Sequence, residues 1–106
     1  MNRRIILRPR ANRDIDNHVD YLAQNNDDTA LEFFDAVRST VAQLARMPGM
    51  GSLYSIKNPR LKGLRRWSVK GFKRYIIFYL EQDDTIEVVR ILHASRDLGN
   101  IFNREQ

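Results

Sequence analysis

Two hydrophobic periods divide the chain into a helical first half and a second half of strands. Within residues 11–25 the apolar side chains recur every three or four positions, the spacing that gathers them on one face of a helix. These apolar residues are Ala11, Ile15, Val19 and Leu22. The acidic residues Asp14, Asp16 and Asp20 are expected to lie off this buried stripe. No Ser, Thr, Asp or Asn stands just before Ala11, so we expect a weakly capped start.

A second helix is predicted from Thr29 to about residue 47. Thr29 and Glu32 match a capping box, in which the first side chain caps the helix and the second reaches back. Pro48 follows and stops the helical pattern. Only four polar residues, 25–28, separate this helix from the first, which predicts an antiparallel helical hairpin.

Strands are predicted on both sides of the helical hairpin. One covers residues 4–8. Three more, joined by short turns that favour an antiparallel meander, cover residues 64–69, 73–81 and 85–93. The strand at 73–81 is apolar on both faces, which is typical of a central strand covered on both sides. We expect its Phe78 to face the helical hairpin. The order is β-α-α-β-β-β, an α+β fold with an antiparallel sheet packed on an N-terminal helical hairpin.

Length and composition place the chain among small single-domain proteins. Its 106 residues form one predicted domain, residues 1–106, and no apolar run approaches the ~18 residues of a membrane span. Cysteine is absent, which excludes disulfides, thiolate nucleophiles and Cys-based zinc sites. No metal-ligand spacing, phosphate-binding loop or signal peptide is present. We therefore predict no metal, no cofactor and a cytoplasmic protein without membrane contact.

Charge is distributed unevenly along the chain. Residues 14–35 hold seven acidic residues and no Lys or Arg, whereas residues 36–80 hold ten Lys or Arg and no acidic residue. The basic segment fits a contact surface for an anionic partner, either nucleic acid or an acidic protein segment. It fits equally well a solvated surface opposite the acidic segment. Aromatic residues such as Trp67 and Phe72 alternate with its arginines, which suits RNA stacking and peptide docking alike.

His93 ends the last predicted strand and is the best candidate for a general acid or base. Arg96 could stabilise an anion beside it, and Asp97 could orient the imidazole ring. The alternative is structural: a hydrogen bond between His93 and Asp97 would pin the tail to the sheet. We favour this structural interpretation.

Two C-terminal segments resemble the ParE branch of the RelE/ParE toxin superfamily. They are LKGLRRWSVKGFKRYIIFY at residues 61–79 and RILHASRDL at residues 90–98. The first predicted helix is also similar to that family through Ala11, Asp14, Ile15, Tyr21, Leu22 and Ala23. The resemblance implies a bacterial type II toxin that poisons DNA gyrase. It also implies a ParD-like antitoxin, encoded alongside, that neutralises the toxin by forming a hetero-oligomer with it.

The RelE branch of the same superfamily suggests an alternative, ribosome-dependent cleavage of mRNA. That activity would use a proton carrier and basic residues on the open face of the sheet. Here the candidates are His93, Arg65, Arg90 and Arg96. No Tyr follows Tyr79 to act as the reactive group, so the gyrase interpretation is preferred and no covalent chemistry is expected.

Two surfaces are assigned to the implied partners. The antitoxin is expected to be acidic where it binds the toxin, because the basic segment would attract it. The residues assigned to the antitoxin are Arg65, Arg66, Trp67 and Arg74. The target is assigned to the tail, the segment that neither the hairpin nor the meander requires. The alternative is that Ile101 and Phe102 seal the core. The residues assigned to the target are Arg96, Asp97, Leu98, Ile101 and Phe102.

Overall fold

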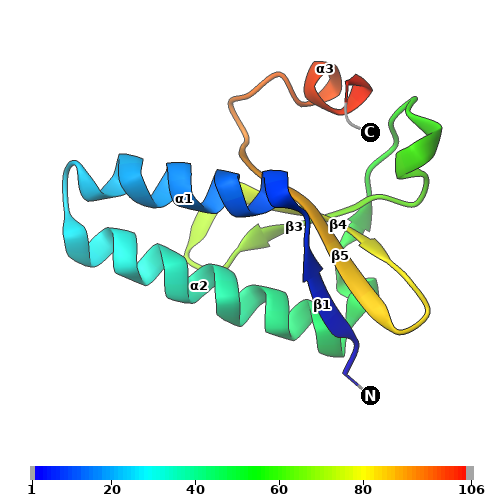
Figure 1. The fold of residues 1–106 in the computed structure, drawn as a ribbon, viewed down its shortest axis with the longest axis horizontal. Helices are drawn as coiled ribbons and strands as arrows, with labels where there is room; N and C mark the ends of the chain where they lie inside the picture. Colours follow the sequence, from blue (N-terminus) through cyan, green and yellow to red (C-terminus); the bar gives the residue numbers. More distant parts are fainter. Residues whose placement is uncertain (1, 105–106) are drawn as a thin grey trace.

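The computed structural model describes residues 2–104 and shows a helical hairpin packed against a five-stranded sheet (Figure 1). The helices are α1 (Pro9–Ala23), α2 (Asp27–Arg46) and the short α3 (Leu98–Asn103). The strands are β1 (Arg4–Leu7), β2 (Ser52–Leu53), β3 (Arg65–Val69), β4 (Phe72–Glu81) and β5 (Thr85–His93). Two 3-10 turns, η1 (Pro48–Met50) and η2 (Pro59–Leu61), lie in the segment between α2 and β3. None of the helices within residues 2–104 is long and apolar enough to cross a membrane.

The sheet has the strand order β1-β5-β4-β3-β2. β3, β4 and β5 form the predicted antiparallel meander. β1 lies parallel to β5 at one edge, with Arg4 opposite Thr85. At the other edge β2 pairs with β3, placing Ser52 opposite Arg66. The sequence did not predict β2, because a two-residue strand leaves no hydrophobic alternation to detect.

The two helix starts show where the capping predictions succeeded and failed. α1 begins at Pro9, whose fixed φ suits the first helical position, and no side chain caps it, as expected. α2 begins at Asp27, because the Asn26 side chain accepts the Thr29 backbone N–H at 3.1 Å. The predicted Thr29 cap is therefore wrong: Thr29 lies inside the first turn, and Asn26 performs the capping.

Each face of the sheet has its own hydrophobic core. The face toward α1 and α2 buries Ile77 and Tyr79 of β4 against helix residues such as Phe33. The opposite face buries Ile76 and Phe78 with residues of the segment 54–64 and of α3. The prediction that β4 is a central strand with apolar residues on both of its faces is confirmed. The expectation that Phe78 faces the helical hairpin is wrong, because Phe78 belongs to the second core.

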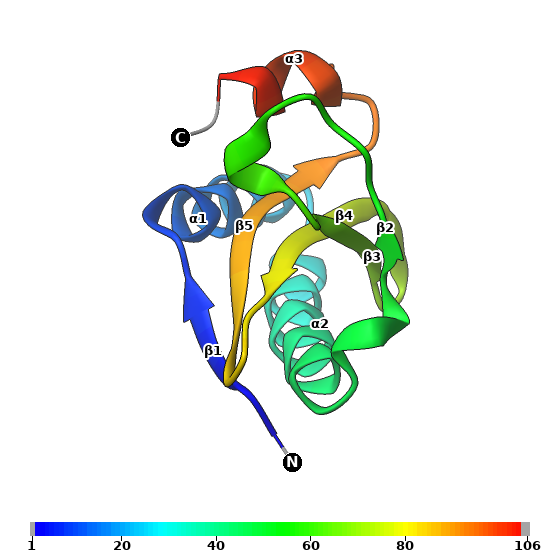
Figure 2. The same ribbon diagram turned by 90° about the vertical axis from the view of Figure 1, so that its right-hand side faces the viewer.

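The tail forms part of this second core. Phe102 is fully buried, and its ring lies 4.7 Å from that of Phe78, measured between centroids. The Asn58 side chain donates a hydrogen bond to the Phe102 carbonyl at 2.9 Å. α3 and the segment around η2 accordingly lie together at the end of the molecule away from α2 (Figure 2). Of the two interpretations of the tail, the structure supports the one in which Phe102 seals the core.

Candidate functional site

A buried ion pair connects α1 to β5. Arg90 donates from Nε to Asp14 Oδ2 at 2.7 Å and from Nη2 to Asp14 Oδ1 at 2.9 Å. Asp14 Oδ2 also accepts the Ile91 backbone N–H at 3.0 Å. Asp14 is 7% exposed and Arg90 is 4% exposed. The prediction that Asp14 lies off the buried stripe is therefore wrong, since its carboxylate is paired inside the protein.

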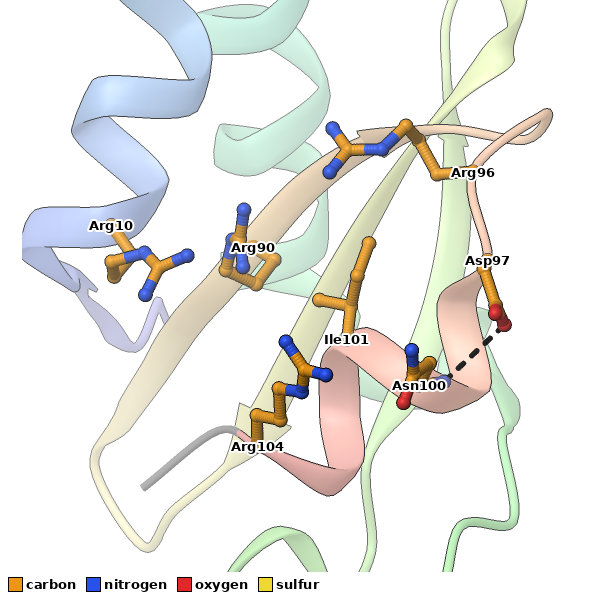
Figure 3. Close-up of a pocket in the computed structure, with 7 residues that line it drawn as sticks. All are labelled: Arg10, Arg90, Arg96, Asp97, Asn100, Ile101 and Arg104. Carbon is orange, nitrogen blue, oxygen red and sulfur yellow. Dashed lines mark hydrogen bonds between the residues drawn. The ribbon is translucent and has the colours of Figure 1, made fainter.

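Arg90 forms the wall of a cavity of about 460 Å³ between the start of α1, β5 and α3 (Figure 3). Arg10 stands one helical turn before Asp14, so the two share a face of α1. This places Arg10 beside Arg90 at the cavity. The other lining residues are Arg96, Asp97, Asn100, Ile101 and Arg104. We call this cavity the arginine pocket.

Three arginines of the pocket are exposed and available to a ligand. Arg10, Arg96 and Arg104 make no side-chain hydrogen bond or ion pair with any residue from 2 to 104. Among the lining residues that the structure describes, Asp97 is the one carboxylate, and it accepts the Asn100 backbone N–H at 3.4 Å, which caps α3. Within residues 2–104 the pocket therefore carries more positive than negative charge and offers three guanidinium groups to an anion.

His93 lies outside the lining of the pocket. Its Nδ1 accepts the Ser95 backbone N–H at 3.1 Å and lies 2.8 Å from the Ser95 hydroxyl oxygen. Its ring packs edge-on against Tyr75, with 5.0 Å between the centroids. The predicted hydrogen bond between His93 and Asp97 is not formed. His93 instead holds the turn that leaves β5.

The second histidine, His18, fastens α1 to the sheet. Its Nε2–H donates to the Ile91 carbonyl at 2.7 Å, and its ring packs edge-on against Phe33 and Tyr75. Burial lowers the pKa of His18, and the hydrogen bond to Ile91 and the Asp14 charge offset only part of this effect. His18 is thus a structural residue that favours its neutral form.

Two of the arginines assigned to the antitoxin already have partners inside the protein. Arg65 donates from Nη1 to the Gly51 carbonyl at 2.6 Å. The Arg66 guanidinium lies over the Tyr54 ring, 5.8 Å from its centroid. Both side chains are half-buried. The sequence could not reveal these contacts, because each partner lies in the irregular segment before β3.

The remaining members of that set are exposed. Trp67 of β3 is 37% exposed, and Arg74 of β4 is also exposed. In the set assigned to the target, Arg96 and Asp97 are exposed, whereas Leu98 and Ile101 are half-buried against the second core. Phe102 is fully buried and presents no surface to a partner in this conformation.

A second hollow, which the sequence did not predict, runs between β1, α1 and α2. It has a volume of about 480 Å³ and is mainly apolar. Its apolar lining includes Ile5, Leu7, Ile15, Phe34, Val37 and Val41. Ile5 is 44% exposed and Phe34 is 40% exposed, although both are large and hydrophobic. We call this hollow the apolar groove.

Comparison with known proteins assigns the chain to a family. Residues 5–98 match a family model described as the ParE toxin of the type II toxin-antitoxin system parDE. The chain belongs to the ParE toxin family. It is therefore a toxin of a type II toxin–antitoxin system, and the family suggested by its C-terminal segments is confirmed.

The fold agrees with this assignment. A similar solved structure is that of the chromosomal ParDE toxin–antitoxin system from P. aeruginosa, with a TM-score of 0.70 and 17% identity. The match covers 88% of this chain and 97% of that chain. The predicted α+β fold of the ParE toxin is confirmed. A search of curated proteins gives no match.

Proposed function

We propose that this ParE toxin inhibits DNA gyrase by binding it and does not act by covalent chemistry of its own. The observation that carries the proposal is the composition of the arginine pocket. Arginine does not release a proton in proteins, so Arg10, Arg96 and Arg104 can bind an anion but cannot act as an acid or base. Among the lining residues from 2 to 104, the one carboxylate is that of Asp97, which caps α3. Such a site is suited to binding.

A ribosome-dependent ribonuclease is the alternative function. It would need His93, Arg65, Arg90 and Arg96 to act on one phosphate group. Arg65 is hydrogen-bonded to the Gly51 carbonyl and Arg90 is paired with Asp14, so each has a structural partner. His93 is turned toward Ser95. These contacts favour gyrase inhibition over RNA cleavage.

Expression of the toxin in bacteria distinguishes the two functions. We expect DNA synthesis to fall and DNA damage and filamentation to appear while protein synthesis is initially unchanged. His93→Gln should reduce toxicity only as far as it reduces folding stability. A ribonuclease would instead stop protein synthesis first. Its activity should fall ~10²–10⁴-fold in the His93→Gln variant, because a general acid or base would be lost.

We propose further that a cognate ParD-like antitoxin covers the apolar groove and the exposed side chains of Trp67 on β3 and Arg74 on β4. The exposed Ile5 and Phe34 fit the apolar side chains of such a segment, and Arg38 lies beside Phe34, 6.0 Å from its ring centroid. Trp67 and Arg74 remain exposed for the same partner. An acidic antitoxin segment would pair with these arginines and place its apolar residues in the groove.

The salt dependence of association tests this arrangement. Steering between exposed charges is screened beyond about 8–10 Å at physiological ionic strength, so association should slow markedly between about 0.05 and 0.5 M salt. Phe34→Ala should instead raise the dissociation rate and leave the salt dependence unchanged. An association rate that does not respond to salt contradicts the acidic partner, and unchanged dissociation in the variant contradicts the use of the groove.

A further inference from the structure

We propose that the arginine pocket binds phosphodiester groups of the duplex DNA backbone. The toxin would then contact DNA itself, whatever protein it inhibits. This inference goes beyond gyrase inhibition and does not depend on it. It rests on three features of the pocket as residues 2–104 form it: its excess of arginine over carboxylate, the chemistry of its lining and the packing of the elements that carry the arginines.

The charge of the pocket calls for an anion with several oxygens. Arg10, Arg96 and Arg104 come from three different segments, namely α1, the turn after β5 and the C-cap of α3. Like charges gathered at one cavity repel one another unless a ligand neutralises them. Each guanidinium presents a planar fork of N–H donors that matches two oxygens of a phosphate. Backbone phosphates would supply one such partner to each arginine.

The lining favours a nucleic-acid backbone over the other anions that arginine can bind. None of the lining residues between positions 2 and 104 is aromatic, so they offer no platform for stacking the bases of a single strand. Ile101 is the one apolar residue among them, whereas a docked acidic peptide would require apolar anchors as well as charge. Binding of backbone phosphates requires neither an aromatic platform nor apolar anchors, and it does not depend on the base sequence.

Arg10 and Arg104 lie at elements that contacts within the protein hold in place. The paired Asp14 and Arg90 hold the start of α1 against β5. The buried Phe102 holds α3 against the sheet. Less conformational freedom is therefore lost on binding than would be lost by arginines in a disordered tail. Figure 3 shows Arg10 to the left of Arg90 and Arg104 below it, with the guanidinium groups of both turned toward Arg90.

The test measures binding of a fluorescent 20-base-pair DNA duplex by the full-length toxin, over a range of salt concentrations. Three proteins are compared. The first is the wild type. The second carries Arg10→Gln, Arg96→Gln and Arg104→Gln. The third carries Arg38→Gln, Arg46→Gln and Lys70→Gln, which remove the same charge from exposed positions outside the pocket. Thermal unfolding of all three checks that the fold is retained.

The expected result is a difference between the two triple variants. Each lost phosphate contact reduces the magnitude of the slope of log K against log salt by about 0.9. The slope of the pocket variant should therefore be smaller than that of the wild type by about 2.7. The control variant should lose less than about 1. Equal losses in both variants would overturn the proposal, because binding would then follow net charge alone. No measurable binding by the folded wild type would also overturn it.

Two competitors decide the class of ligand. A single-stranded oligonucleotide of the same length and a heptaglutamate peptide are each titrated against the bound duplex. Unlabelled duplex serves as the reference competitor. The proposal expects unlabelled duplex to displace the labelled duplex most strongly, the single strand to displace it less, and the peptide to displace it least. Stronger displacement by the peptide would overturn it in favour of an acidic protein segment. Stronger displacement by the single strand would overturn the preference for duplex DNA. Gyrase is absent throughout, so failure here leaves gyrase inhibition to be judged separately.

Discussion

The arginines of β3 and the arginines of the pocket carry the same charge but stand in opposite situations. Arg65 donates to the Gly51 carbonyl and Arg66 lies over Tyr54, so both are committed to the protein's own structure. Arg10, Arg96 and Arg104 have no such partner within residues 2–104. The basic run at residues 36–80 contributes none of the arginines of the pocket. Charge density along the sequence therefore did not locate the charge that is available to a ligand.

Arg90 represents a third situation, a buried arginine that is fully paired. Removing one partner of a buried pair leaves an uncompensated charge, which typically costs 3–5 kcal/mol. We expect Asp14→Asn to lower the free energy of unfolding by about 3–5 kcal/mol in urea denaturation. The matched variant Asp16→Asn, at an exposed position of the same helix, should change it by less than about 0.5 kcal/mol. If Asp14→Asn lowered the free energy of unfolding only slightly, Arg90 would be solvated like the other arginines of the pocket.

A second large effect is expected where α3 joins the second core. Phe102→Ala should cost about 3–5 kcal/mol, because a fully buried aromatic ring leaves a cavity beside Phe78. Phe34→Ala, at a ring that is 40% exposed, should cost less than half as much. Equilibrium unfolding measures both variants. Near wild-type stability of Phe102→Ala would show that the tail is a separate contact segment, as the sequence first suggested.

A smaller effect is expected for the β3 arginines. Arg65→Ala removes a charged donor from the Gly51 carbonyl and should cost about 1–2 kcal/mol. Arg74→Ala, at an exposed side chain of the neighbouring strand, should stay within about 0.5 kcal/mol of the wild type. The same unfolding experiment compares them. If both variants were equally stable, Arg65 would be as available to a partner as the arginines of the pocket.

The smallest effect concerns His18, which packs under the β5 segment that carries Arg90. Burial holds the pKa of His18 below its usual value near 6.5. Between the lowered pKa and about 6.5 the unfolded chain binds more protons at this group than the folded protein. Stability should therefore decrease as the pH falls below about 6.5. His18→Gln should flatten this part of the pH profile, and an unchanged profile would show that His18 is not responsible.

The hydrophobic pattern was sufficient to predict the helical hairpin and the meander. The six apolar residues in a row at 75–80 predicted a central strand with two covered faces, and the structure has a core on each face. The hydrophobic pattern indicates which positions are buried, and both faces of β4 are buried. The pattern does not indicate which elements cover each face. For that reason Phe78 was assigned to the face that packs on the helical hairpin, whereas it lies in the second core.

Side-chain partners that are distant in sequence could not be predicted. Asp14 looked like a surface residue because a carboxylate is buried only when something neutralises it, and its partner Arg90 lies 76 residues away. The arginine pocket was missed for the same reason, since Arg10 comes from the other end of the chain. The sequence offered two interpretations of Phe102, a contact for the target or part of the core, and could not decide between them because its partner Phe78 lies 24 residues away.

The central claim, that this ParE toxin binds gyrase, is tested most directly by supercoiling of a relaxed plasmid by purified gyrase. Increasing amounts of folded toxin should progressively block supercoiling, and prior addition of its antitoxin should restore it. Arg65→Ala should inhibit as the wild type does once its folded fraction is taken into account. Full supercoiling in the presence of excess toxin, shown to be folded by its cooperative unfolding, would contradict the account.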